Sequence, residues 1–226
     1  MFHNGSYVDR GTIGYKSELV RKSIHMLSLS IPVVYYFITK QLALSILIPL
    51  AAFTLIVDVA RQFYPKLGEL FYLTFGFMLR EHERNSKKKN LNGATFVLLS
   101  AVLCIWILPK VFVVTAFGVL IISDTSAALI GRKFGRHPFL KKSLEGTLAF
   151  FISACLVVLA APKVAGYPVE YLIGFVACAI GAVVENISYG WADDNLSIPL
   201  SIGLSMWLLY LLLLPGVQPV LLNVPN

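Results

Sequence analysis

Charged residues are scarce in this chain, and their scarcity excludes most soluble folds. Asp, Glu, Lys and Arg make up 14% of the 226 residues, whereas soluble domains contain about one quarter of such residues. Hydrophobic residues make up 57% of the chain, and its mean hydropathy is +0.75. This composition predicts an integral membrane protein.

The sequence also lacks the alternating hydrophobicity that is typical of a transmembrane β-strand. Its apolar runs are continuous, and a spanning helix needs about 20 mostly apolar residues. We therefore predict an all-α integral membrane protein, a polytopic bundle of about seven transmembrane helices in a single domain over residues 1–226. The spans are expected near 23–38, 42–57, 93–108, 111–130, 147–161, 171–185 and 197–214.

Cysteine is rare and is not arranged for metal binding or for disulfides. Cys104, Cys155 and Cys178 all fall inside predicted spans, and their spacing does not resemble that of a metal site. A buried thiol behaves as a small hydrophobic group. We therefore expect the three cysteines to pack in the core.

Positive charge is nearly absent from one side of the predicted membrane topology. Of the 19 Lys and Arg residues, 16 lie in 1–22, 59–92, 131–146 and 186–196. Because basic residues concentrate in cytoplasmic loops, we predict a cytoplasmic N-terminus, with a tail over 1–20 and cytoplasmic or interfacial loops over 60–92 and 131–146. The net charge of +7 then reflects topology rather than nucleic-acid binding, and no pattern predicts a protein partner.

Asp124 is the most unusual polar residue, because it lies inside the fourth predicted span. It is roughly 10 Å from the inner end of that span, at the rise of an α-helix. A carboxylate at this depth is costly and is typical of a functional site. The alternative is a structural ion pair with an Arg or Lys of another helix.

The loop after Asp124 has the chemistry of a phosphate site. It contains glycines, several basic residues and a serine just before the next predicted helix, and a helix N-terminus with free N–H groups suits phosphate. Glu145 beside it suits a metal ion that holds a polyphosphate. Positive-inside topology and lipid headgroup contact remain an alternative for the basic residues. The residues concerned are Gly131, Arg132, Lys141, Lys142, Ser143 and Gly146.

Further polar groups lie at the predicted inner ends of other spans. Arg21, Lys22 and His25 open the first span, and Asp58 and Arg61 close the second as a possible i, i+3 pair. Carboxylates and an amide oxygen are ligands that Mg²⁺ prefers. Asp194 and Asn195 are also suited to capping the last helix. Arg21 and Lys22 are also suited to anchoring the first span in the lipid headgroups. The remaining candidates are Arg80, Glu185, Asp194 and Asn195.

Several short motifs occur in an order that is similar to one known superfamily. The chain resembles the CTP-dependent lipid kinases, which include dolichol, phytol and farnesol kinases and yeast-type diacylglycerol kinase, with phosphatidate cytidylyltransferases as more distant relatives. The motifs that carry the resemblance lie at 18–25, 58–61, 80–83, 92–95, 124–135, 141–147 and 194–199. One departure from the family pattern is Ser123, which stands where the family usually has Gly. The chain lacks the long C-terminal signature of the cytidylyltransferases, and this absence favours the kinases.

The resemblance implies CTP as the phosphoryl donor, Mg²⁺ or another divalent cation, and a lipid alcohol in the membrane as the acceptor. It matches Arg21, Lys22, Asp124 and Gly131 to positions that the family needs for activity. We expect the catalytic residues to be Asp124, Asp194, Arg21 and Lys22.

The other predicted roles follow from the same reasoning. The nucleotide is expected to contact Arg21, Lys22, Arg80, Gly131, Arg132, Lys141, Lys142, Ser143 and Gly146. The metal is expected at Asp124, Glu145, Glu185, Asp194 and Asn195. The alternative functions are cytidylyl transfer to phosphatidate and a lipid-binding or transport protein without enzymatic activity.

Overall fold

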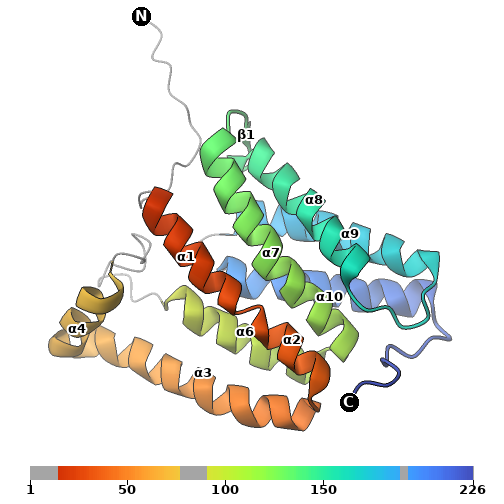
Figure 1. The fold of residues 1–226 in the computed structure, drawn as a ribbon, viewed down its shortest axis with the longest axis horizontal. Helices are drawn as coiled ribbons and strands as arrows, with labels where there is room; N and C mark the ends of the chain where they lie inside the picture. The colour runs from red at the N-terminus through yellow and green to blue at the C-terminus, as the bar shows by residue number, and fades with distance from the viewer. Residues whose placement is uncertain (1–14, 77–90, 189–192, 226) are drawn as a thin grey trace, which may run out of the picture.

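The computed structural model describes residues 15–76, 91–188 and 193–225, and within them it is almost entirely helical (Figure 1). The first half contains α1 (Tyr15–Leu27), α2 (Ser30–Phe37), α3 (Lys40–Phe63), α4 (Pro65–Phe75) and α6 (Gly93–Ile107). The second half contains α7 (Lys110–Phe134), β1 (Pro138–Phe139), β2 (Lys142–Ser143), α8 (Leu144–Ala160), α9 (Pro168–Ile187) and α10 (Asp194–Leu213). The strands β1 and β2 form an antiparallel hairpin.

Each predicted span falls on helical structure. The helices α3, α7, α9 and α10 are long and apolar enough to cross a membrane, and α6 and α8 are shorter apolar helices. The first predicted span is divided into α1 and α2 by the non-helical residues Ser28 and Leu29. The all-α membrane class is thus supported, while the number of crossings and their orientation stay predictions.

The starts of several helices are fixed by side-chain caps. A capping oxygen accepts a backbone N–H that the first turn cannot satisfy. Ser143 Oγ accepts the N–H of Gly146 at 3.2 Å, which ends the hairpin and begins α8. The equivalent caps of α3, α6 and α10 are Thr39, Asn92 and Asp193. The predicted capping of α10 by Asp194 or Asn195 is therefore wrong by one or two positions.

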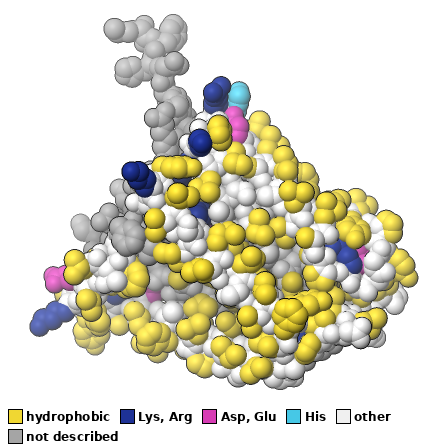
Figure 2. Space-filling view, in the orientation of Figure 1, with side chains coloured by type: hydrophobic (Ala, Val, Ile, Leu, Met, Phe, Trp, Pro, Cys, Tyr) yellow, Lys and Arg dark blue, Asp and Glu magenta, His cyan; other side chains and the backbone are white. Residues whose placement is uncertain are grey.

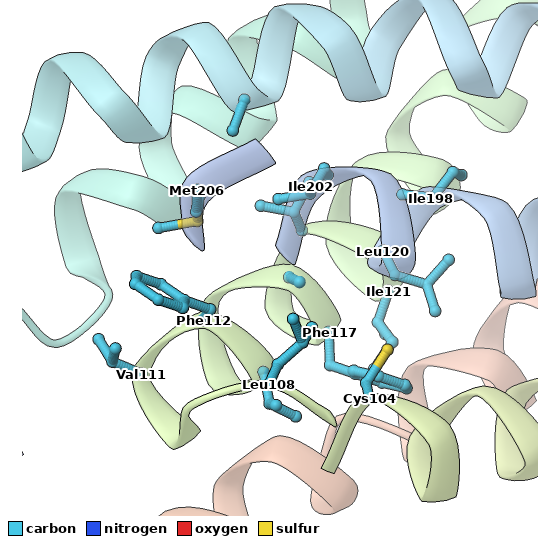
Figure 3. Packing of buried hydrophobic residues seen from close by; sticks show 14 of the residues in the cluster. Cys104, Leu108, Val111, Phe112, Phe117, Leu120, Ile121, Ile198, Ile202 and Met206 are labelled. Atoms are coloured by element: carbon cyan, nitrogen blue, oxygen red, sulfur yellow. The ribbon is translucent and has the colours of Figure 1, made fainter. Parts of the chain in front are cut away.

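The helix α7 lies at the centre of the bundle, with α1 and α2 on one side and α8 and α10 on others (Figure 1). Its side chains Phe112, Phe117 and Leu120 are fully buried. Figure 3 shows them close to Ile202 and Met206 of α10. Cys104 and Cys178 are buried free thiols, as expected, whereas Cys155 is only partly buried. This apolar core holds α7, and therefore Asp124, in a fixed position.

The end of α3 is joined to the start of α6 by a buried carboxylate and to α4 by the arginine that pairs with it. Asp58 accepts Arg61 Nε at 2.5 Å and the N–H of Asn92 at 2.6 Å. The predicted i, i+3 pair is thus confirmed. The Arg61 guanidinium also lies 4.6 Å from the centre of the Phe71 ring in α4, where a cation–π contact is favourable.

A second buried carboxylate holds the opposite end of the bundle. Glu170, at the start of α9, accepts the N–H groups of Val164, Ala165 and Tyr167 at 2.8, 3.0 and 2.9 Å. It also accepts the hydroxyl of Tyr210 in α10. These contacts fix the connection between α8 and α9.

We predict that Glu170→Ala destabilises the fold by about 3 kcal/mol or more, because it leaves buried donors without an acceptor. Tyr210→Phe removes a single donor and should cost only about 1 kcal/mol. Thermal unfolding of the purified variants in detergent measures both effects. Equal losses in the two variants would contradict the assigned role of Glu170.

Candidate active site

A buried ion pair joins α1 to α7. Lys22 Nζ donates to Asp124 Oδ2, and the two residues are 1% and 3% exposed. His25, one turn further along α1, places Nε2 3.6 Å from the same carboxylate oxygen. Sequence analysis left two alternatives for Asp124, a functional site or a structural ion pair with another helix. The structure shows the basic partner that the second alternative requires.

A second ion pair joins the hairpin to α9. Lys142 Nζ donates to Glu185 Oε1 at 2.5 Å, while Glu185 Oε2 is buried and accepts no hydrogen bond from the described residues. Burial alone would lower the pKa of Lys142, but the charges of Glu185, Asp194 and Asp124 outweigh it and raise that pKa. Lys22, Lys142, Asp124, Glu185 and Asp194 therefore form one lysine–carboxylate cluster.

Glu18 connects the edge of this cluster to two arginines. Its carboxylate accepts Arg21 Nη2 at 2.6 Å and Arg21 Nε at 3.1 Å, and it lies 3.5 Å from Arg132 Nη2 of α7. Burial would raise the pKa of Glu18, but Arg21, Lys22 and Arg132 lower it below its usual value. Sequence analysis did not place Glu18 in the site, although its spacing before Arg21 and Lys22 on one helix was a usable signal.

The glycines of the loop allow α7 and α8 to approach closely. A Cβ at Gly131 would lie 3.1 Å from Ser143 Oγ and 3.3 Å from Gly146 Cα. A Cβ at Gly146 would lie 3.2 Å from the carbonyl oxygen of Ala127. These positions need glycine for packing, whatever ligand the loop binds. The predicted nucleotide contacts of Gly131, Ser143 and Gly146 stay predictions.

Other predicted site residues point elsewhere. Glu145 pairs with His137 Nδ1 at 2.7 Å on the exposed side of the hairpin. Asn195 donates from Nδ2 to Asp193 Oδ1 at 2.7 Å. Lys141 Nζ is exposed and donates to the carbonyl of Ile187 at 3.0 Å, and Arg80 lies outside the described residues. The structure therefore does not bring Glu145 to the cluster, whereas the backbone N–H of Asn195 donates to Asp194 Oδ1 at 3.1 Å.

Asn186 is a site residue that sequence analysis missed. It is fully buried next to Glu185, and its Oδ1 accepts the backbone N–H groups of Lys141 and Lys142 at 2.8 and 3.1 Å. A single Asn near the end of an apolar helix carries no spacing signal. Its contact with the hairpin depends on the packing of α9.

The carboxylates of the cluster suit a divalent cation. In the described part of the chain, no group of three or more His, Cys, Asp and Glu side chains is arranged to hold a metal ion. However, Mg²⁺ commonly uses one or two carboxylates and completes its shell with water and substrate phosphates. The unpaired Oε2 of buried Glu185 is such a ligand, so the residues fit an ion that arrives with a polyphosphate.

The cluster lies at the end of the bundle that carries most of the basic side chains. Figure 2 shows Lys and Arg side chains above an otherwise mainly hydrophobic face, near α1 and the hairpin in the orientation of Figure 1. Ammonium groups stabilise phosphate charge, and buried carboxylates hold a cation or accept a proton. The arrangement is therefore suited to chemistry on a phosphate ester at a membrane surface.

Comparison with known proteins finds two relatives with named activities. The chain is 34% identical over 177 residues to CTP-dependent diacylglycerol kinase 1 of Schizosaccharomyces pombe. The matched region covers 69% of this chain and 74% of that protein. It is 38% identical over 101 residues to phytol kinase of Synechocystis sp., with 41% and 42% covered.

An uncharacterised protein of Rickettsia prowazekii is 32% identical over 195 residues, which cover 86% of this chain and 95% of that protein. No family model and no solved structure matches the chain.

We predict that Lys22→Met costs about 3–5 kcal/mol of stability, because it leaves the Asp124 carboxylate buried without its partner. The double variant Lys22→Met/Asp124→Asn removes both charges and should recover most of this loss. Lys16→Met, at an exposed position of α1, is the matched control and should have little effect. Unfolding in detergent tests the set, and additive losses in the double variant would disprove the coupling.

Proposed function

The chain belongs to the lipid kinase family of its Schizosaccharomyces pombe relative, and from this premise we propose that it is a CTP-dependent lipid kinase. It phosphorylates the hydroxyl of a membrane lipid alcohol, either a polyprenol or dolichol, a phytol-like isoprenoid alcohol or diacylglycerol. CTP is supported by the name of that relative, which covers most of both chains. The acceptor is left at the level of the class.

The lysine–carboxylate cluster is the observation that carries this proposal. It gathers Lys22, Lys142 and Asp124 from separate elements of the bundle at a buried position. Lys22 and Lys142 bind and neutralise the phosphates, assisted at the edge by Arg21 and Arg132. Because phosphoryl transfer depends mainly on positioning and charge stabilisation, preorganised ammonium groups supply much of what the reaction needs.

The reaction is an in-line transfer of the γ-phosphoryl group. The lipid oxygen forms a bond to the γ-phosphorus, the bond from that phosphorus to the bridging oxygen breaks, and CDP leaves. Asp124 or Asp194 orients the lipid hydroxyl and accepts its proton. Asp124, Glu185 and Asp194 are the candidate ligands of a divalent cation such as Mg²⁺, which when bound neutralises charge on the phosphate oxygens.

The same proposal places the site on the cytoplasmic face of the membrane. The connections that lie at this end hold most of the Lys and Arg residues, as the positive-inside rule requires of cytoplasmic loops. CTP then enters from the cytosol, and the lipid alcohol reaches the cluster from the bilayer.

We predict that purified protein with Mg²⁺ transfers label from γ-labelled CTP, and not from α-labelled CTP, to one of polyprenol, phytol, farnesol or diacylglycerol. Asp124→Asn should lower kcat by about 100-fold or more, the range expected for a lost general base. Glu69→Gln, which neutralises an exposed carboxylate of α4, is the control and should retain activity.

Label from α-labelled CTP in phosphatidate, with release of pyrophosphate, would instead show the cytidylyltransferase reaction. Full activity of folded Asp124→Asn would remove Asp124 from the catalytic group. If neither labelled nucleotide reacts with any lipid, the lipid-binding alternative replaces the kinase.

The orientation has a separate test in intact cells. In a background without the three native cysteines, His137→Cys, at an exposed position just before β1, should react with a membrane-impermeant maleimide only after the cells are opened. Gln218→Cys, in the exposed C-terminal segment, should react without opening. The reverse pattern would invert the predicted topology.

A further inference from the structure

Lys142 is held at both its backbone and its side chain by two consecutive residues of α9. Its Nζ donates to Glu185 Oε1 at 2.5 Å, and its backbone N–H donates to Asn186 Oδ1 at 3.1 Å. The same Asn186 oxygen accepts the N–H of Lys141 at 2.8 Å. One buried side chain therefore fixes the backbone of both lysines against the end of α9.

The orientation of the Asn186 amide is itself determined by its neighbours. Asn186 Nδ2 lies 2.6 Å from Thr147 Oγ1, and that hydroxyl donates its one proton to the carbonyl of Ser143 at 3.0 Å. Thr147 Oγ1 must then accept from Asn186, which assigns the amide nitrogen to this side and the oxygen to the hairpin. The hairpin and the first turn of α8 are thus coupled through one amide.

The turn that these hydrogen bonds support is not favourable by itself. Leu140 has φ of 50°, a left-handed conformation that non-glycine residues seldom adopt without compensation. The turn directs the two lysines differently, since Lys141 Nζ reaches the exposed end of α9 at Ile187 while Lys142 Nζ enters the cluster. The geometry of this turn decides which lysine faces the carboxylates.

We propose that Asn186 is a positioning residue that holds the 140–143 turn so that Lys142, and not Lys141, is presented to the nucleotide phosphates. The inference rests on the proposed function and adds to it a residue that does not itself touch substrate. Loss of Asn186 leaves the attraction between Lys142 and Glu185 in place but releases the backbone that carries Lys142. Nucleotide binding should therefore suffer more than the chemical step.

The kinetic test compares two substitutions of Asn186. Asn186→Ala should raise KM for CTP about tenfold, as expected when two backbone hydrogen bonds lose their acceptor, and change kcat by less than about threefold. Asn186→Asp keeps an acceptor for the two N–H groups and should keep their hydrogen exchange slow, although its added charge beside Glu185 also raises KM. Thr115→Val, which removes a buried hydroxyl bonded within its own helix α7, is the matched control and should leave KM for CTP unchanged.

Hydrogen exchange gives a readout that needs no nucleotide. In Asn186→Ala, the amides of Lys141 and Lys142 should exchange faster than in the wild type, while those of α10 should not. Unchanged exchange would overturn the inference, and so would faster exchange with an unchanged KM for CTP. If the wild type transfers no phosphoryl group from CTP, the proposed function fails instead, and exchange still shows whether Asn186 holds the turn.

Discussion

The buried ion pair between Lys22 and Asp124 is the contact on which the end of the bundle around the hairpin depends. A lysine and a carboxylate that are withdrawn from water remain charged only because each neutralises the other, and the removal of either leaves an uncompensated charge in an apolar surrounding. The pair fastens α1 to α7. On the side of α1 that faces away from α7, Leu19, Ile24 and Leu27 are exposed. The proposed function assigns phosphate chemistry to the same groups, so in that account structural and chemical roles are combined.

The two ends of the bundle use buried carboxylates in contrasting ways. Glu170 accepts three backbone N–H groups and one hydroxyl, so its hydrogen-bonding capacity is largely used within the fold. Glu185 accepts Lys142 on one oxygen and leaves the other without a partner among the described residues. A buried acceptor that remains unsatisfied is costly, and a cation or substrate would remove that cost. The two carboxylates therefore differ in how completely the fold itself satisfies their hydrogen-bonding capacity.

Because apolar run length is a local signal, sequence analysis predicted the helical class and most helix positions. It also singled out Asp124, a carboxylate inside such a run, whose catalytic role stays a prediction. It also identified the Asp58–Arg61 pair, which depends only on helical spacing. It did not foresee the interruption at Ser28 and Leu29, although Pro32 was a usable signal, because proline has no N–H to donate to the carbonyl of Ser28 four residues earlier. The partnership of Asn186 with the hairpin and the outward position of Glu145 depend on how α8 and α9 pack, which no short sequence pattern encodes.

A structure of the protein with Mg²⁺ and a CTP analogue whose β,γ-bridging oxygen is replaced by methylene would test the central claim most directly. The account predicts that the β- and γ-phosphates lie against Lys22 and Lys142, with a cation between them and the carboxylates of the cluster. Phosphates bound instead at the exposed side of the hairpin, near Arg136 and Lys141, with the Lys22–Asp124 pair undisturbed and covered by protein, would contradict it. The buried cluster would then be a structural feature only.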